Sequence, residues 1–148
     1  MNGHKFWKWF LMVGALLAVL LTAACSSEKA LKSPEGLALS AKGNALMICL
    51  KDKDLQGVHD LMSPRVQRVM DFGLKIAEKY VDMDALLEQQ AKISAWNFER
   101  ARIYTLNGAT VGSLDGGVEY VDGTKGKVRL DFEKDDGAWK VKGYTLEP

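Results

Sequence analysis

Cysteine is the residue type whose surroundings in this chain point most clearly to chemistry. The 148 residues contain two cysteines, and Cys25 comes directly after Ala23 and Ala24. Small residues at these two positions let a peptidase approach the backbone next to Cys25. Cys49 lies in an apolar stretch without a neighbouring base, where a thiol usually packs as a small hydrophobe rather than reacting as a nucleophile. Once Cys25 is modified, Cys49 has no partner, so we expect no internal disulfide.

Acid–base candidates are His59 and three tyrosines, Tyr104, Tyr120 and Tyr144. His59 lies beside Asp60 in a predicted short helix. It would serve either as a base at the mouth of a pocket or, more commonly, as a solvent-exposed helix residue. The tyrosines lie in predicted strands and would offer hydroxyls to a ligand, although half-buried packing is their commoner role. We assign no catalytic residue from the sequence.

Metal, cofactor and nucleic-acid binding have little support. One histidine and one cysteine beyond the first 25 residues cannot complete a zinc site. The acidic run 131–136 departs from the calcium-loop pattern, because Asp136 stands where glycine is required and Lys142 where glutamate is. The whole chain has 20 basic and 19 acidic residues without a basic block, which gives no electrostatic footprint for nucleic acid. We therefore expect no metal, no cofactor and no nucleic-acid partner.

The first 24 residues have the pattern of an export signal. Lys5 and Lys8 precede an apolar run from Phe10 to Leu21, and small residues follow. About 12 apolar residues make roughly 18 Å of helix, short of a hydrocarbon core of ~30 Å. The segment therefore suits a cleaved signal, with cleavage between Ala24 and Cys25, better than an uncleaved membrane anchor.

The sequence Leu21-Thr22-Ala23-Ala24-Cys25 resembles the lipobox of bacterial lipoproteins, with Thr22 where leucine is commoner. The resemblance implies that Cys25 is acylated and holds the mature chain on a membrane. Ser26 resembles the outer-membrane sorting pattern, so in a host with two membranes we expect a periplasm-facing lipoprotein of the outer membrane. Residues 25–33 would form a short tether; eight extended residues reach roughly 27 Å. A basic cluster is then either a solvated face or a contact with anionic headgroups; its members are Lys51, Lys53, Arg65 and Arg68.

The mature chain has the size of one domain, which we place at residues 34–148. Ser33-Pro34-Glu35 predicts a helix start, and the helix is expected to end near Lys51. Shorter helices are predicted at residues 54–62 and 64–80, with a further helical turn or two at 82–91. The expected apolar stripe of the first helix consists of Leu39, Ala41, Ala45, Leu46, Ile48, Cys49 and Leu50.

After residue 92 the apolar period changes to two, and Asn-Gly or Asp-Gly pairs separate four predicted strands, at 96–106, 109–121, 126–134 and 138–146. Val128, Leu130 and Phe132 alternate with charged residues, which indicates a sheet with one dry face. We expect an irregularity in the first strand that turns Ala101 and Ile103 inward. Asp115-Gly116-Gly117 is either a bulge, which we favour, or a further turn.

The sequence therefore predicts an α+β fold, with three N-terminal helices packed on a curved four-stranded antiparallel sheet. The closing segment 135–141, Asp-Asp-Gly-Ala-Trp-Lys-Val, and the helical segments 37–50 and 53–64 resemble the cone-shaped nuclear transport factor 2-like superfamily. The resemblance implies the fold more than an activity. Some members are isomerases or dehydratases with a carboxylate, tyrosine or histidine inside the cone.

The expected function is that of a non-catalytic binding or scaffolding module anchored in the cell envelope, which holds a hydrophobic ligand or an envelope protein. Candidate pocket-lining residues are Trp96, Phe98, Phe132 and Trp139, for each of which plain core packing is the commoner role. One alternative is an isomerase or hydrolase-like enzyme of the same fold that uses His59 and Tyr104. Another is an assembly subunit that buries the outer face of its sheet against a second copy.

The anchor is tested by Cys25→Ala. Because the acyl chains attach through the thiol, we expect this variant to lose all labelling by a radioactive or alkyne-tagged fatty acid and to accumulate as the unprocessed precursor. Cys49→Ala is the matched control and should be labelled and processed normally. A labelled Cys25→Ala protein would contradict lipidation at this residue.

Overall fold

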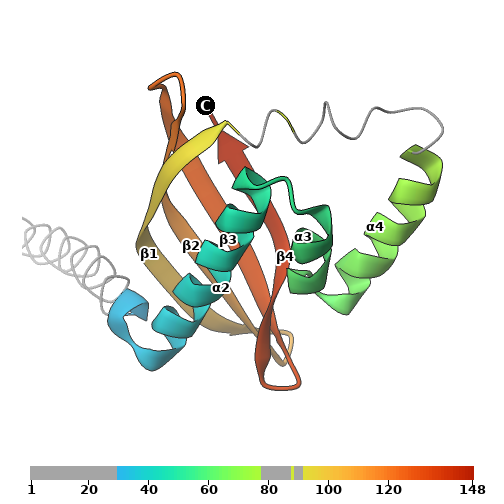
Figure 1. Ribbon diagram of the computed structural model, residues 1–148. Coiled ribbons are helices and arrows are strands. Elements are labelled where there is room, and N and C mark those ends of the chain that lie inside the picture. Colours follow the sequence, from blue (N-terminus) through green and yellow to red (C-terminus); the bar gives the residue numbers. More distant parts are fainter. Residues whose placement is uncertain (1–29, 78–87, 89–91) are drawn as a thin grey trace, which may run out of the picture.

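The computed structural model describes residues 30–77, 88 and 92–148 (Figure 1). The helices come first: α2 (Pro34–Lys51), α3 (Leu55–Leu61) and α4 (Pro64–Ala77). The strands follow: β1 (Ile93–Leu106), β2 (Ala109–Tyr120), β3 (Lys125–Asp135) and β4 (Ala138–Glu147). They form one open antiparallel sheet in the order β1-β2-β3-β4, so the fold is α+β as predicted. The predicted export signal and Cys25 lie outside the described residues, as does the helical segment expected at 82–91 apart from residue 88, which is helical.

The predicted start of α2 is confirmed. The Ser33 hydroxyl caps the helix by accepting a hydrogen bond from the Gly36 amide at 3.1 Å, and Pro34 occupies the first turn. The ordered domain nevertheless begins earlier than predicted. Residues 30–32 are helical, and Ala30 and Leu31 pack against the core. These residues therefore shorten the tether that we expected to extend to Ser33.

The buried side of α2 differs from the predicted stripe. Ile48 is 49% exposed and Ala41 is also exposed, whereas Met47 is fully buried. The buried row runs through Gly43, where an added Cβ would lie 2.8–2.9 Å from side-chain atoms of Leu114 and Phe98. Glycine adds no hydrophobic signal to a sequence pattern, so the buried row of α2 could not be predicted from its apolar residues. Its members are Gly36, Leu39, Gly43, Leu46, Met47 and Leu50.

Three bulges decide which strand residues face inward, and the first lies at Ser94 in β1, between the pairs Ile93–Tyr120 and Ala95–Glu119. In β1, Glu99 is an extra residue between the pairs Phe98–Gly116 and Arg100–Asp115. Beyond it Ala101 is fully buried and Ile103 packs against the core, as predicted. β2 continues through Asp115-Gly116-Gly117 without a turn. A bulge does occur at this point of the sheet, but the extra residue is Glu99 on the facing strand, β1, rather than a residue of β2.

The third bulge lies in β4 at Lys142. Phe132 pairs with Val141, whereas Asp131 pairs with Gly143, so Lys142 is left over. Trp139 and Val141 face the core before the bulge, and the parity then changes. Tyr144 and Leu146 pack against the core after it.

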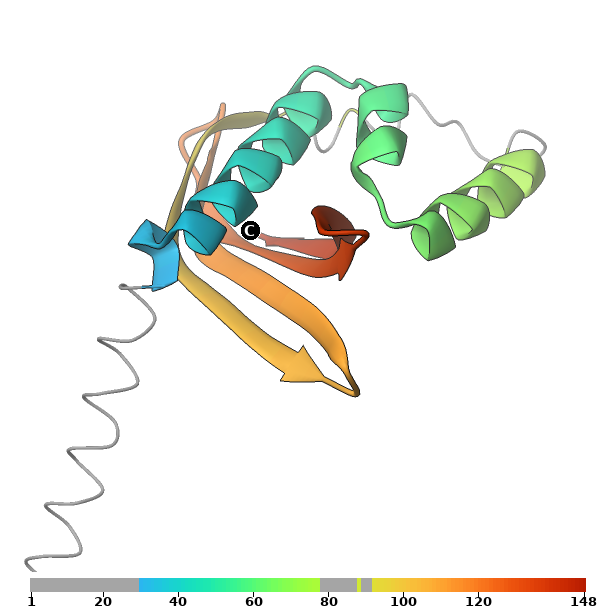
Figure 2. The same ribbon diagram turned by 90° about the horizontal axis from the view of Figure 1, so that it is seen from below.

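The helices cover the inner face of the sheet unequally (Figures 1 and 2). α2 lies across the sheet and contacts β1, β2 and β4, while α3 packs on α2. α4 has its main contact with α3 and projects beyond the sheet, so it does not pack on the sheet as we had predicted. Val69 and Phe72, on α4, are 66% and 69% exposed.

The linker between α3 and α4 explains this difference. Met62 forms a parallel bridge with Val141, and the Ser63 amide donates a 2.8 Å hydrogen bond to the Val141 carbonyl. Since β4 is the last strand of the sheet, this pairing fixes the linker at the sheet edge. Pro64 starts α4 immediately afterwards, beyond that edge.

A polar contact joins the start of α2 to the β3–β4 hairpin. The Glu35 carboxylate accepts hydrogen bonds from Lys134 Nζ at 2.6 Å and from Trp139 Nε1 at 2.8 Å. The Lys134 ammonium also lies 5.3 Å from the centre of the Trp139 ring. These hydrogen bonds, with Lys134 the stronger influence, hold the pKa of Glu35 below its usual value.

Gly116→Ala should destabilise the fold. A Cβ at this position would lie 1.9 Å from the Asn97 carbonyl oxygen, a backbone atom that cannot move without shifting β1. We expect a loss of about 1–3 kcal/mol in the free energy of unfolding, measured in urea. Gly143→Ala, where nothing lies within 4 Å of the added atom, is the control and should change stability by less than ~1 kcal/mol. Equal effects of the two variants would contradict the close approach of β1.

Glu35 should give the protein an acid-sensitive stability. Its pKa is lowered in the folded state, so its contribution is fully present above about pH 4.5, the usual carboxyl value, and is lost as pH falls through the lowered folded value. Urea unfolding of wild type and Glu35→Gln should therefore differ at neutral pH and converge in acid. Asp135→Asn, in the same hairpin, is the control. A wild-type advantage over Glu35→Gln that persists unchanged at pH 2 would contradict this assignment.

Candidate functional site

A hollow of about 640 Å³ lies at one end of the sheet, and we call it the inner-face hollow. Its described walls come from the start of β1, the β2–β3 hairpin and the end of β4. The hairpin turns through Gly123, whose φ of +83° suits glycine. The volume is in the range of small-molecule sites. The lining residues are Lys92, Tyr120, Val121, Asp122, Thr124, Tyr144, Leu146 and Pro148.

The floor of the inner-face hollow is aromatic and aliphatic. Tyr120, Tyr144 and Leu146 are half-buried and pack against the core. Burial raises the pKa of Tyr120, so its hydroxyl stays protonated and can donate a hydrogen bond. This combination suits an apolar ligand that carries a small polar group.

The acid at the rim of this hollow is already engaged. Asp122 accepts hydrogen bonds from the Thr124 hydroxyl at 2.5 Å and from the Thr124 amide at 2.9 Å. These bonds, the hydroxyl first, lower the pKa of Asp122. Its charge therefore stabilises the turn, and a carboxylate whose pKa is lowered is a poor general base.

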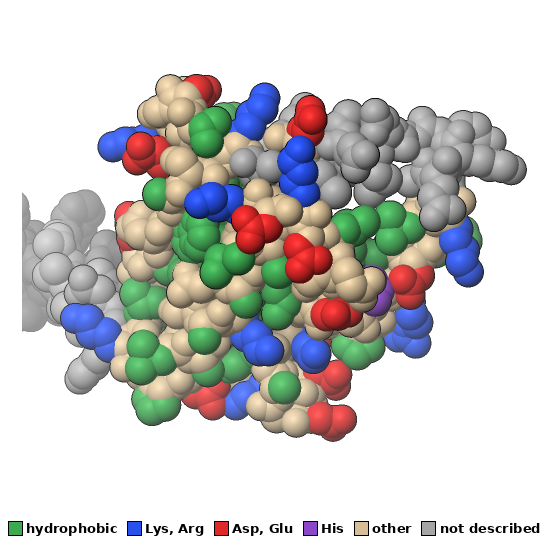
Figure 3. Space-filling model, in the orientation of Figure 1, with side chains coloured by type: hydrophobic (Ala, Val, Ile, Leu, Met, Phe, Trp, Pro, Cys, Tyr) green, Lys and Arg blue, Asp and Glu red, His purple; other side chains and the backbone are tan. Residues whose placement is uncertain are grey.

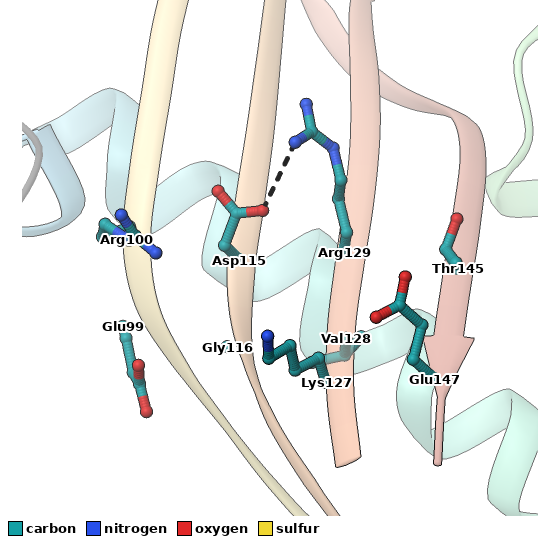
Figure 4. Close-up of a pocket in the computed structure, with 9 residues that line it drawn as sticks. All are labelled: Glu99, Arg100, Asp115, Gly116, Lys127, Val128, Arg129, Thr145 and Glu147. Carbon is teal, nitrogen blue, oxygen red and sulfur yellow. Dashed lines mark ion pairs between the residues drawn. The ribbon is translucent and has the colours of Figure 1, made fainter.

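A second, polar groove of about 300 Å³ lies on the opposite face of the sheet, and we call it the outer-face groove (Figure 4). Arg100, Asp115, Arg129 and Thr145 form one row across its four strands. The groove contains acids and bases in equal number. The acids are Glu99, Asp115 and Glu147, and the bases are Arg100, Lys127 and Arg129.

Asp115 is the most enclosed acid of the outer-face groove, with a side chain 19% exposed. Its Oδ1 lies 3.6 Å from Arg129 Nη1, and its Oδ2 lies 3.7 Å from Arg102 Nη2. Figure 4 shows the Arg129 and Asp115 side chains pointing toward each other. The pairing places a carboxylate between two guanidinium groups, where its charge is matched rather than free for catalysis.

The structure places the four predicted lining residues in or against the core. Phe132 is fully buried and Trp139 is 4% exposed. Trp96 and Phe98 are half-buried and pack on the core, and the Trp96 indole donates a 2.9 Å hydrogen bond to Asn44. None of the four lines the inner-face hollow or the outer-face groove.

The two residues of the enzymatic alternative are not brought together. His59 contacts Asp71 on α4 through Nε2 at 3.0 Å and Asp60 through Nδ1 at 3.5 Å. Tyr104 lies on the outer face of β1, where it is 49% exposed, next to Ile103, which faces inward. The helices and Tyr104 are therefore on opposite sides of the sheet.

Cys49 is half-buried, and its thiol lies 3.9 Å from an Asp54 oxygen. Burial, followed by the charges of Asp54 and Asp52, raises its pKa. The protonated thiol is therefore favoured, in agreement with an unreactive role. The described residues contain no group of histidine, cysteine and acidic side chains placed to hold a metal.

The sequence did not identify the lining of the inner-face hollow. Tyr120 and Tyr144 were candidates for ligand hydroxyls, but Leu146 and Val121 were not singled out. The available signal was the even parity of Tyr144 and Leu146 against the odd parity of Trp139 and Val141, which requires one extra residue between them.

In the described part of the chain, no helix combines the length and apolar character that crossing a membrane requires. Comparisons with protein families, curated proteins and solved structures return no match for the chain.

Proposed function

We propose that this chain is a lipid-anchored protein of the cell envelope that binds an apolar ligand in the inner-face hollow without transforming it. The anchor would be Cys25, after removal of residues 1–24, and in a host with two membranes the domain would face the periplasm from the outer membrane. The observation that carries the binding role is the composition of the hollow. Two tyrosines and Leu146 form its floor, and the acid at its rim is bound into a turn.

The distribution of charge supports a binding role over catalysis. Among the described residues, every fully buried side chain is apolar except those of Ser63 and Ser113. A general base must reach within about 3 Å of the proton it removes. His59 is held between α3 and α4 by carboxylates, and Asp115 faces the other side of the sheet between two arginines. Neither group reaches the inner-face hollow.

The finer fold assignment that we propose is the nuclear transport factor 2-like cone. Its support is the order of the elements, in which a long helix, a short helix and a third helix precede a four-stranded meander. The closing hairpin also places Trp139 under α2, hydrogen-bonded to Glu35.

A homodimer built on the outer face of the sheet is the less favoured alternative. Stable interfaces have a central core depleted in charged residues. Six charged side chains line the outer-face groove instead. Burying them against a second copy would require each to be desolvated and paired, which offsets much of the attraction gained.

Ligand binding is tested with a neutral fluorescent probe, N-phenyl-1-naphthylamine, titrated into the purified protein. We expect saturable binding with increased emission, because the probe leaves water for an apolar wall. Val121→Asp should weaken the affinity about tenfold, which corresponds to about 1.4 kcal/mol. Val121 is 68% exposed, so this change should not disturb folding.

Leu106→Asp is the matched control, because Leu106 is 52% exposed at the opposite hairpin of β2. This variant, His59→Ala and Tyr104→Phe should all bind the probe like wild type. Binding that is unaffected by Val121→Asp, or equally weakened by Leu106→Asp, would remove the inner-face hollow as the site.

A further inference from the structure

α4 has one side that faces the domain and another that faces solvent. On the first side Val66 and Met70 are half-buried against the core. Gln67 donates a 2.9 Å hydrogen bond to the His59 carbonyl, and Asp71 contacts the His59 ring at 3.0 Å. These contacts orient the helix and engage Asp71, its only acidic side chain.

The solvent side of α4 combines cations with large apolar side chains. At 3.6 residues per turn, five of its exposed residues fall within about one third of the helix circumference. These five contain no acid, although Asp71, which is 59% exposed and contacts His59, borders them. None of the three cations forms an ion pair within the described residues. Lys and Arg side chains project at the α4 end of the molecule in Figure 3. We call this side the α4 strip, and its members are Arg65, Arg68, Val69, Phe72 and Lys75.

We propose that the α4 strip lies on an anionic membrane surface, with Phe72 and Val69 entering the boundary between headgroups and acyl chains. A helix with an aromatic residue and aliphatic groups beside cations is the usual form of an interfacial helix. The three cations match the negative surface potential of anionic lipids. The proposal rests on the lipid anchor of the proposed function for keeping the domain at the membrane.

A lipid surface explains the strip better than a second copy does. In a twofold dimer the same strip would face itself, so Arg65, Arg68 and Lys75 would meet like charges. It also explains the position of the helix. α4 projects past the edge of the sheet, where a flat surface can reach it (Figures 1 and 2).

The test uses the acylated protein in vesicles, with an environment-sensitive fluorophore on Phe72→Cys in a Cys49→Ser background. One set of vesicles is phosphatidylcholine, and the other also contains phosphatidylglycerol; both carry brominated acyl chains as quenchers. We expect a blue shift and quenching of the label in the anionic vesicles and a much smaller effect in the neutral ones. A label on Leu106→Cys, at the β1–β2 hairpin, is the matched control and should respond in neither.

Charge reversal provides the second arm. Arg65→Glu combined with Arg68→Glu should reduce quenching at position 72 about tenfold in anionic vesicles. Both side chains are exposed, so circular dichroism should be unchanged. Quenching that is equal in neutral and anionic vesicles, or insensitive to this reversal, overturns the proposal. A label response that rises with protein concentration without vesicles also overturns it, in favour of a second copy.

Failure of the anchor is distinguishable from failure of the strip. If mass spectrometry finds Cys25 unmodified, the lipid anchor fails, and the unacylated protein is added to the same vesicles. Quenching at position 72 that depends on anionic lipid would still support the strip as a membrane contact. Its absence there overturns the strip as well.

Discussion

Packing of α2 across the inner face of the sheet is the interaction on which the other features depend. Leu39, Leu46 and Leu50 are buried to 1% exposure or less, and each contributes about 1.5–3 kcal/mol by leaving water. The contact is close because Gly43 admits Phe98 and Leu114 to the helix surface. One helix cannot cover a sheet of four strands, so α2 leaves one end of the sheet free. Within the described residues, the inner-face hollow lies at that end.

Strand register determines which side of the sheet carries the charge. Each bulge adds one residue to its strand. The residues that face inward therefore change from odd to even numbers, or from even to odd, across the bulge. Ser94 and Glu99 produce such shifts in β1, and Lys142 produces one in β4. All three extra residues are exposed at the surface. The inner face therefore stays mainly apolar, and acids such as Asp115 remain on the outer face among arginines.

The sequence was sufficient where the pattern depends on local chemistry. Asn-Gly and Asp-Gly turns separated the four strands, and their left-handed glycines, such as Gly108 and Gly137, are present. Alternation in β3 predicted its buried residues correctly. The pattern failed where burial depends on a distant neighbour. Gly43 is buried because β1 and β2 approach it, and Lys142 becomes a bulge because of the register of β3 against β4. The apolar period of α4 indicates that one side of the helix is buried, but it does not indicate which element buries that side.

The linker at the β4 edge has two consequences that belong together. By pairing with Val141, residues 62–63 cover part of a sheet edge that would otherwise be open to another strand. The same pairing starts α4 outside the sheet, where 14 residues have little core to bury. A helix of this length is marginal in water without tertiary contacts, and here those contacts come mainly from α3, through Gln67, Asp71 and the His59 ring. Val69 and Phe72 are 66% and 69% exposed, so burying them in another phase would add to the free energy that holds α4 in a defined place.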